Sequence, residues 1–247
     1  MNELTNGFTI SIEGTTKSWH SLDDWGLAIG NNDYIGEPVQ ETTYIQVPGR
    51  DGLIDVSETV AGRPIFKKRS ISIVVGALHN RMDWDSVMSG IRNKIHGRVC
   101  HIIFDNDITY YWRGRVSVNS FDRSRRLGTF KIEMPNADPY KYSISSSAEP
   151  WLWDPFNFET DVITYIGAIT VTGSETVTLP SGNMLVSPEF VVSDIVGSLI
   201  VECNGRTYTL VQGTNNIPSI LVGGDNEVEL EFTGNGKVQI VYRSGSL

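Results

Sequence analysis

Glutamate and large apolar residues alternate strictly from Glu227 to Phe232, with Val228 and Leu230 among the apolar members. A period of two is the period of a β-strand, because successive side chains point to opposite faces. This stretch therefore predicts a strand with one buried face and one solvated, acidic face. No helix accommodates such a pattern.

The residues that follow indicate how this strand continues. Gly234-Asn235-Gly236 has the composition of a turn, and a second apolar series with a period of two comes after it. We predict a hairpin with all its large apolar residues on one face. Its register pairs Phe232 with Val238, Leu230 with Ile240, Val228 with Tyr242 and Glu227 with Arg243.

The rest of residues 146–247 shows the same strand signals. Short β-rich runs are separated by Gly and Asn at intervals of roughly 8–12 residues, which is typical of a β-sandwich or jelly roll. No helical pattern is present there. Cys203 shares a strand face with Leu199 and Val201, so we expect a core thiol rather than a reactive one.

The first half is also mainly β but contains one helix. Apolar residues recur at helical spacing between Asp83, the expected N-cap, and Gly97, which follows the expected last turn. We expect this helix to pack on a sheet through a stripe that includes Trp84, Ile91 and Ile95.

Two further patterns in the first half predict strands. Ile71, Ile73 and Val75 alternate with other residues, which predicts a strand with one strongly apolar face. The runs 99–104 and 109–118 flank a turn-forming triplet at 105–107, which predicts a hairpin. Within the first run Cys100 and His101 are adjacent, so their side chains should point to opposite faces.

Charge divides the chain into two parts. It has 20 Lys and Arg against 29 Asp and Glu, a net charge of -9. Residues 1–145 contain 17 of each sign, so the 3 basic and 12 acidic residues of 146–247 account for the whole imbalance. Small polar residues and prolines between Ser143 and Pro155 mark the boundary, and we predict two domains, 1–145 and 146–247. The low basicity argues against a generic nucleic-acid binder.

The sequence contains no evident catalytic, cofactor or metal motif. There is no G-x-S-x-G elbow, no P-loop and no metal-ligand spacing around the four histidines and two cysteines. We therefore expect no enzyme, no cofactor and no metal. The amino terminus shows no signal peptide and no apolar run is long enough to span a bilayer, so we expect synthesis in the cytoplasm and no membrane insertion.

Two kinds of side-chain cluster have more than one interpretation. For the basic clusters, salt bridges to a neighbouring chain or a solvated face are favoured over nucleic-acid binding, because the first half has as many acids as bases; they comprise Lys67, Lys68, Arg69, Arg113, Arg115, Arg123, Arg125 and Arg126. The aromatic cluster either forms a buried plug between the domains or stacks on a glycan; it comprises Trp151, Trp153, Phe156 and Phe158.

Several segments, taken in order, resemble the distal tail protein (Dit) family of long-tailed, siphovirus-type bacteriophages. The similarity depends on their order and spacing along nearly the whole chain rather than on one motif. These segments are Ser21–Leu27, Val47–Asp55, Arg69–Ile73, Trp112–Arg115, Ala137–Tyr142 and Val241–Leu247.

The resemblance implies a mainly β protein. Its amino-terminal domain is a β-sandwich or split barrel with one packed helix, and its carboxy-terminal domain is a galectin-like or jelly-roll sandwich. Six copies of the first domain form a ring at the distal end of the tail tube, around a channel for DNA. The expected partners are the tail tube protein, the tail-associated lysin or tail-tip hub protein, and receptor-binding proteins. The expected location is the virion.

Residues 47–55 are a predicted hairpin tip, because Pro48-Gly49 and Asp51-Gly52 favour tight turns with positive φ. Arg50 and Asp51 are candidate subunit contacts, although an exposed turn without a partner is the alternative, and Lys67, Lys68, Arg69, Arg113 and Arg115 are further candidates. The rival function is carbohydrate binding by the carboxy-terminal domain in cell-wall attachment, through Trp151 and Trp153.

Overall fold

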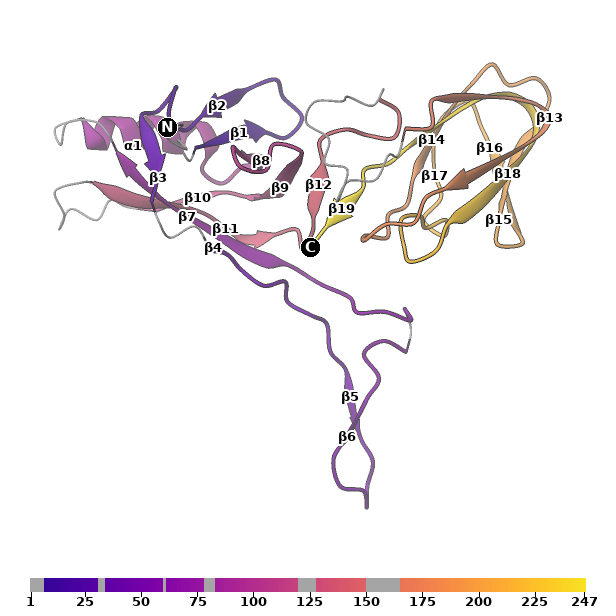
Figure 1. Cartoon of the computed structure of the whole chain (residues 1–247), viewed down its shortest axis with the longest axis horizontal. Coiled ribbons are helices and arrows are strands. Elements are labelled where there is room, and N and C mark those ends of the chain that lie inside the picture. Colours follow the sequence, from indigo (N-terminus) through magenta and orange to yellow (C-terminus); the bar gives the residue numbers. More distant parts are fainter. Residues whose placement is uncertain (1–6, 31–33, 60, 78–82, 120–127, 150–164) are drawn as a thin grey trace. The chain divides into compact units, whose positions relative to one another are not determined.

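The computed structural model describes residues 7–30, 34–59, 61–77, 83–119, 128–149 and 165–247 (Figure 1). The chain forms two compact units, Met1–Lys141 and Tyr142–Leu247. Both consist mainly of antiparallel β-sheet, which confirms the predicted fold class. The division between the units falls within β12 (Lys141–Ser143), which pairs with the carboxy-terminal β19 (Gly245–Ser246).

The first unit contains two antiparallel sheets whose apolar faces share one core. The first has the order β9-β8-β1-β2, and in the second β10-β11-β7-β3 is extended by β4 on β7. Their bounds are β1 (Phe8–Ile12), β2 (Ser18–His20), β3 (Leu27–Ile29), β4 (Tyr34–Ile35), β7 (Arg69–Ala77), β8 (Val99–Phe104), β9 (Tyr110–Arg115), β10 (Ser117–Val118) and β11 (Thr129–Ala137).

The strand patterns predicted for this unit are confirmed, except that the run 109–118 divides into β9 and β10, which belong to different sheets. On β7, Ile71, Ile73 and Val75 are buried in the core. The hairpin of β8 and β9 forms around the turn that begins at Asp105. Cys100 is fully buried while His101 lies on the opposite, partly exposed face.

The single described helix, α1 (Trp84–Ile95), packs its apolar stripe into this core. Trp84, Ile91 and Ile95 are buried as predicted, and Gly97 follows the helix with a φ of +76°. Asp83 occupies the N-cap position as predicted, although its side chain makes no capping hydrogen bond. Its backbone is already in the helical region, whereas a capping residue usually has an extended conformation.

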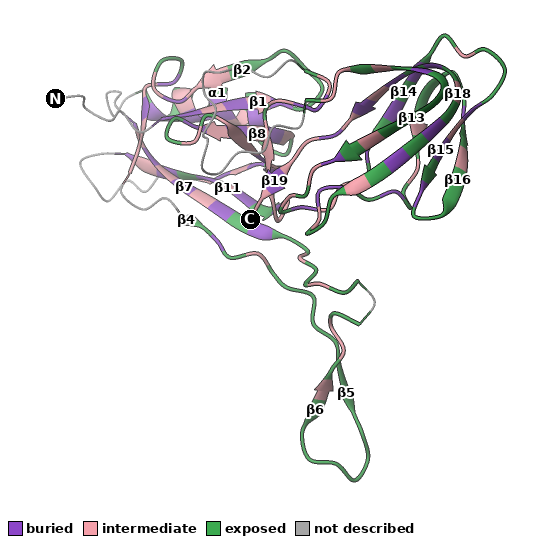
Figure 2. Cartoon of the chain, turned by 45° about the vertical axis from the view of Figure 1, so that its right-hand side comes forward, coloured by how far each residue is buried: buried purple, intermediate pink, exposed green. Residues whose placement is uncertain are grey.

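A long two-stranded arm interrupts the second sheet between β4 and β7. We define the arm as residues 37–68; its strands are β5 (Tyr44–Gln46) and β6 (Leu53–Asp55), which pair only with each other. None of its described residues is buried (Figure 2). The arm thus adds almost nothing to the core of its own unit.

The second unit is built around β18 (Val228–Val241). Along one edge β18 pairs with β13 over nearly its whole length; along the other it pairs first with β15 and then with β14. The remaining strands extend these pairs outward. Their bounds are β13 (Ala168–Leu179), β14 (Glu189–Ser193), β15 (Leu199–Cys203), β16 (Arg206–Leu210) and β17 (Gly213–Asn216).

The predicted hairpin at Gly234-Asn235-Gly236 was wrong, because β18 runs through these residues as one continuous strand. Gly234 pairs with Gly173 of β13 and with Leu199 of β15 instead of closing a loop. The cross-strand pairs predicted for that hairpin are therefore absent. Arg243, expected opposite Glu227, instead donates hydrogen bonds to the carbonyl oxygens of Ser143 and Ile144.

The predicted burial of this stretch was nevertheless correct. Five of the apolar residues predicted for this face are buried, namely Leu230, Phe232, Val238, Ile240 and Tyr242, and Val228 packs partly against them. A three-residue loop and a continuous strand both keep even-numbered residues on one face, so burial alone cannot distinguish them. Cys203 is buried beside the fully buried Leu199 and Val201, as predicted for a core thiol.

Replacement of Gly234 tests this arrangement. Its φ is +127°, and a Cβ at this position would overlap the carbonyl oxygen of Ser198. We expect Gly234→Ala to lower the free energy of unfolding by roughly 2–4 kcal/mol, through strain and steric overlap. Chemical denaturation of the full chain measures this loss.

Gly205→Ala is the matched control for that variant. Gly205 also has a positive φ, +71°, but a Cβ added there would meet no atom within 4 Å. Backbone strain alone should cost about 1 kcal/mol at this position. Equal losses in the two variants would contradict a close approach of β15 to Gly234.

Candidate subunit-interaction surface

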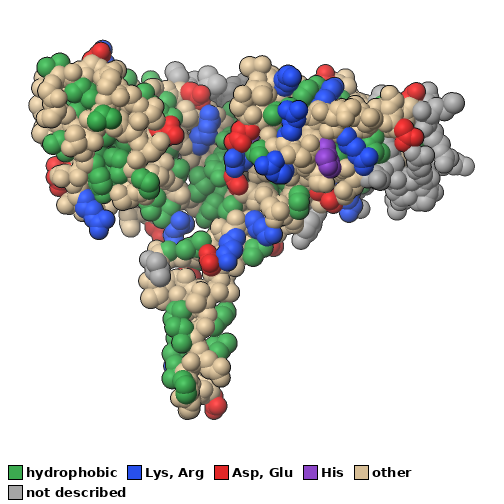
Figure 3. Space-filling model, turned by 180° about the vertical axis from the view of Figure 1, so that it is seen from behind, with side chains coloured by type: hydrophobic (Ala, Val, Ile, Leu, Met, Phe, Trp, Pro, Cys, Tyr) green, Lys and Arg blue, Asp and Glu red, His purple; other side chains and the backbone are tan. Residues whose placement is uncertain are grey.

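The arm exposes several large apolar side chains. Leu53 is 60% exposed, Tyr44 53% and Ile45 49%, and Val39 and Ile65 nearer its base are also exposed. Figure 3 shows hydrophobic side chains along the arm. Such a concentration of apolar surface is typical of a segment that another molecule covers.

Pairing within the arm does not bury these side chains. Residues directly opposite one another share a face, so Ile45 and Ile54 lie on one face while Tyr44 and Leu53 lie on the other. Both faces are therefore partly apolar. An isolated two-stranded ribbon is marginally stable in water, so the arm is expected to gain stability from a third layer.

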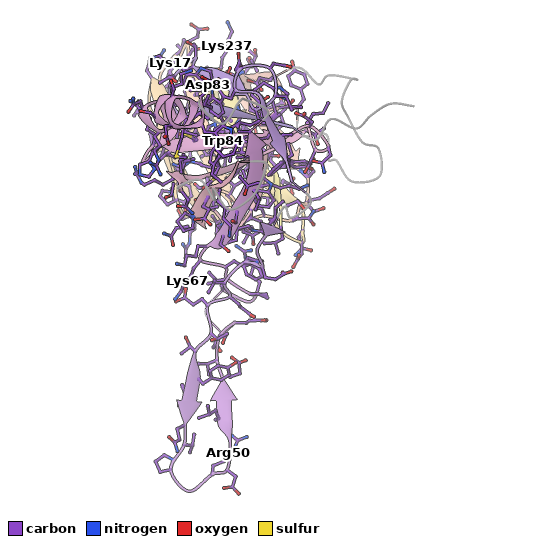
Figure 4. All side chains as sticks on the ribbon, turned by 90° about the vertical axis from the view of Figure 1, so that its left-hand side faces the viewer. Lys17, Arg50, Lys67, Asp83, Trp84 and Lys237 are labelled. Carbon is purple, nitrogen blue, oxygen red and sulfur yellow. The ribbon has the colours of Figure 1, made fainter. Side chains whose placement is uncertain are left out.

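The tip has the predicted turn conformation. Gly49 and Gly52 have φ values of +83° and +82°, and the N–H of Arg50 donates to the carbonyl oxygen of Val47. Arg50 and Asp51 are both exposed at the free end of the arm, where Figure 4 labels Arg50. Within the described part of the chain neither side chain has an ion pair or hydrogen bond.

The base of the arm is anchored to the first unit. Phe66 packs edge-on against Tyr140 with ring centroids 6.2 Å apart, and Lys68 Nζ donates to Asn136 Oδ1 at 2.6 Å. Lys67 pairs across the arm with Glu41 at 3.1 Å. These contacts fix where the arm leaves the sheet, and they use both lysines within the chain.

Arg69 lies inside its own unit. Its side chain is 6% exposed, donates through Nε to the carbonyl oxygen of Pro139 at 2.8 Å, and stacks over the Trp112 ring at 4.5 Å. These contacts hold the start of β7 against the segment that follows β11. That segment begins at Asp138, directly after the last residue of β11.

Arg113 is the centre of an ionic network on the outer face of the first sheet. Its guanidinium pairs with Glu13 at 2.8 Å and with Asp138 at 3.1 Å, while His101 Nε2 lies 3.8 Å from Glu13 Oε1. The hydrogen bonds from Arg113 lower the pKa of Glu13 below its ordinary value of 4.5. Arg115 donates to the carbonyl oxygen of Gly97.

Other candidates give no chemical site in the described residues. Cys100 and Cys203 are free and buried, and burial raises the pKa of Cys100 to about 11. The described histidines, cysteines and acids form no group of three that could hold a metal ion. No helix in the described ranges is long and apolar enough to cross a membrane. Outside those ranges lie Arg123, Arg125, Arg126, Trp151, Trp153, Phe156 and Phe158.

Comparison with known proteins adds one finding. The sequence matches no protein-family model and no curated protein. Among solved structures, it is similar to the Dit protein (gp 19.1) of SPP1, with a TM-score of 0.60 over 97% of this chain and 99% of that chain. The chain has the fold of SPP1 Dit. Sequence identity is 14%, so the likeness confirms the expected resemblance at the level of the fold.

Within this Dit fold, the exposure of the arm's apolar side chains does not follow from the local sequence. Tyr44, Ile45 and Leu53 are ordinary strand residues in the sequence, and their local pattern does not distinguish a core strand from an exposed ribbon. One usable signal was present: the short apolar runs on either side of the 48–52 turn lack one consistently polar face.

The ionic network predicts how stability depends on pH. A carboxyl whose pKa is lowered by folding stabilises the protein above its ordinary pKa, and that contribution is lost as the pH falls through the folded value. Glu13→Gln should therefore lower the free energy of unfolding at pH 7, by less than about 1 kcal/mol because the pair is partly exposed. The difference from the wild type should shrink as the pH falls below the ordinary value of 4.5, and it should disappear once the pH lies below the lowered pKa of folded Glu13.

Denaturation curves at several pH values measure this difference. Glu229→Gln is the control, because Glu229 is exposed on β18 and has no ion pair among the described residues. The difference in unfolding free energy between Glu229→Gln and the wild type should not grow as the pH is raised from 4 to 7. A Glu13→Gln deficit of equal size at pH 3 and pH 7 would contradict an ionic contribution.

Proposed function

We propose that this protein is a distal tail protein, a structural and non-enzymatic component of the tail tip in a phage virion. The observation that carries the proposal is the match of both units to SPP1 Dit along nearly the full length of each chain. The SPP1 protein is described as a paradigm of the hub adsorption apparatus in phages that infect Gram-positive bacteria. A hub acts through its contacts with other proteins, which fits a chain with an exposed apolar arm.

Six copies form a ring in this proposal, through their first units. One side of the ring contacts the tail tube protein, and the other contacts the tail-associated lysin or tail-tip hub protein. The second, galectin-like unit offers a surface for receptor-binding proteins. Support for assembly comes from the arm, since a ribbon with apolar side chains on both faces gains stability from a neighbouring chain.

The charge distribution supports passage of DNA through the ring without specific binding. Some basic residues of the first unit are paired with acids of the same unit, as at Arg113 with Glu13 and Lys141 with Asp107. Paired cations attract phosphate weakly, and the chain as a whole carries a charge of -9. A channel lined by such a protein has little affinity for the DNA that moves through it.

Native mass spectrometry of the purified full-length protein tests the ring. The expected species has six times the chain mass of 27.4 kDa, either for the protein alone or after mixing with the tail tube protein of the same phage. Only a monomer at every concentration, with and without the tube protein, would overturn the proposed ring.

Truncating the exposed apolar side chains of the arm tests its part in assembly. Tyr44→Ser combined with Leu53→Ser removes two side chains from one face, so the protein concentration needed for half-assembly should rise at least about tenfold. Static light scattering over a concentration series measures it. Val196→Ser, at a 70% exposed position in the second unit, is the control and should leave assembly unchanged.

A further inference from the structure

Strand β13 leaves one long edge of the second unit open. It spans Ala168–Leu179, twelve residues, and among the described strands it pairs with β18 alone (Figure 1). Its other edge therefore presents a row of backbone N–H and C=O groups with no described strand beside it. The even-numbered side chains from Thr170 to Thr178 are all exposed, so the described part of the chain does not cover this face.

The composition of β13 favours a further strand at this edge. Natural proteins usually protect an edge strand by keeping it short or by placing lysine or proline on it. β13 is about twice as long as an average strand and contains neither residue. Glu175 is its one charged residue, and most of the others are threonine and valine, which are typical of paired strands.

The sequence of β13 reads nearly the same in both directions. Residues 169–179 are ITVTGSETVTL, with Ser174 at the centre. Every threonine is matched by a threonine, every valine by a valine, and the first isoleucine by the last leucine; Gly173 and Glu175 are the exception. Antiparallel pairing reverses one strand relative to the other. A palindromic strand that pairs with its own copy therefore places like residues opposite each other.

We propose that β13 pairs edge to edge with β13 of a second copy of this chain, antiparallel and about a two-fold axis through Ser174. Ser174 then lies opposite Ser174 of the second copy, and Thr172 lies opposite its Thr176. Both copies use the same edge, so the contact is isologous and closes at two chains. The paired strands join the sheets of two second units into one continuous sheet.

Side chains on both faces of the strand suit this register. On the outer face, Thr172 meets Thr176 of the second copy, and threonine pairs across two strands stabilise a sheet through their hydroxyl groups. On the inner face, Val171 and Leu179 are already buried in the core of their own unit. Pairing at the edge therefore requires no rearrangement of that core.

The exception at the centre of the palindrome is also accommodated. Glu175 lies opposite Gly173 of the second copy, and a Cβ added at Gly173 would meet no atom within 4 Å, so this face has room for the glutamate side chain. The two Glu175 side chains then lie on a diagonal, with their Cβ atoms roughly 7–8 Å apart. Their repulsion is weaker than that of charges directly opposite each other, and salt screens it.

This contact is separate from the proposed ring. The copies of one ring repeat around a single axis, whereas the paired strands have a two-fold axis of their own. The contact belongs to the second unit and makes no use of the arm. It would therefore join two free chains or two rings, and its failure and the failure of the ring are distinguishable.

Disulfide cross-linking of the full-length protein tests both the contact and its register. Ser174→Cys places two thiols directly opposite each other, so mild oxidation should give a linked dimer on a non-reducing gel and no larger product. Thr172→Cys alone should not link, because its two copies lie roughly 14 Å apart, four residues out of register. A mixture of Thr172→Cys and Thr176→Cys should link. The native Cys100 and Cys203 are buried.

Thr207→Cys is the matched control. Thr207 is also exposed, on β16 at one end of the strand order of the same unit, and this variant should not link. Equal linking of all exposed thiols would indicate random collision and overturn the proposal. Linking of Thr172→Cys alone, or none in its mixture with Thr176→Cys, would show that the register is wrong and would also overturn it. A ring detected by native mass spectrometry without linked Ser174→Cys dimers overturns this contact and leaves the ring standing.

Charge exchange is a second test that does not depend on oxidation. Thr172→Lys combined with Thr176→Lys places like charges opposite each other twice, so pairing should require at least about a tenfold higher concentration. An equal mixture with the double variant Thr172→Glu and Thr176→Glu should pair again, because each lysine then faces a glutamate. Native mass spectrometry identifies the mixed pairs by their mass.

The charge variants should fold normally. Both positions are exposed, so each double variant should keep a denaturation midpoint close to that of the wild type. Recovery in the mixture cannot come from a folding defect in either variant. Unchanged pairing of the lysine variant, or no recovery in the mixture, would contradict the proposed contact.

Discussion

The second unit depends on one strand that keeps its period of two over fourteen residues. β18 places Leu230, Phe232, Val238 and Ile240 on the same core while three other strands pair with its two edges. A slip of one residue would turn all four side chains to solvent and the acidic residues to the core. The alternation of apolar residues and glutamates therefore fixes the register of the strands around it. Because residue 234 is glycine, β18 can continue without a break at the point where the start of β15 approaches its backbone closely.

Burial could be predicted from the sequence more reliably than pairing. The buried residues of β7, α1 and β18 follow from local periodicity, because a face is a property of a few neighbouring residues. The partner of a strand depends on residues far along the chain: Gly234 pairs with Gly173 and Leu199, which lie outside any local window. The turn chemistry of Gly234-Asn235-Gly236 therefore predicted a hairpin where the structure has a strand.

The same limit applies to the candidate interaction surface. The turn at the tip was predictable, because Gly49 and Gly52 adopt positive φ for local reasons. The partners of the basic residues could not be predicted, because they lie far away in the sequence. Arg113 pairs with Glu13, one hundred residues away, and Arg69 is buried against Trp112. What distinguishes the arm is the lack of a covering layer, and that is visible only after the rest of the chain has folded.

The separation of charge between the two halves has a consequence for assembly. If the excess of acid lay in the unit that carries the arm, bringing several copies together would bring like charges together and oppose the contact. The first 145 residues instead contain equal numbers of acids and bases, whereas the following residues carry the whole net charge of -9. Free chains then repel one another weakly through their second units, which favours solubility. In the proposed ring, contacts between first units would meet no net repulsion, so the apolar surface of the arm would decide how the copies associate.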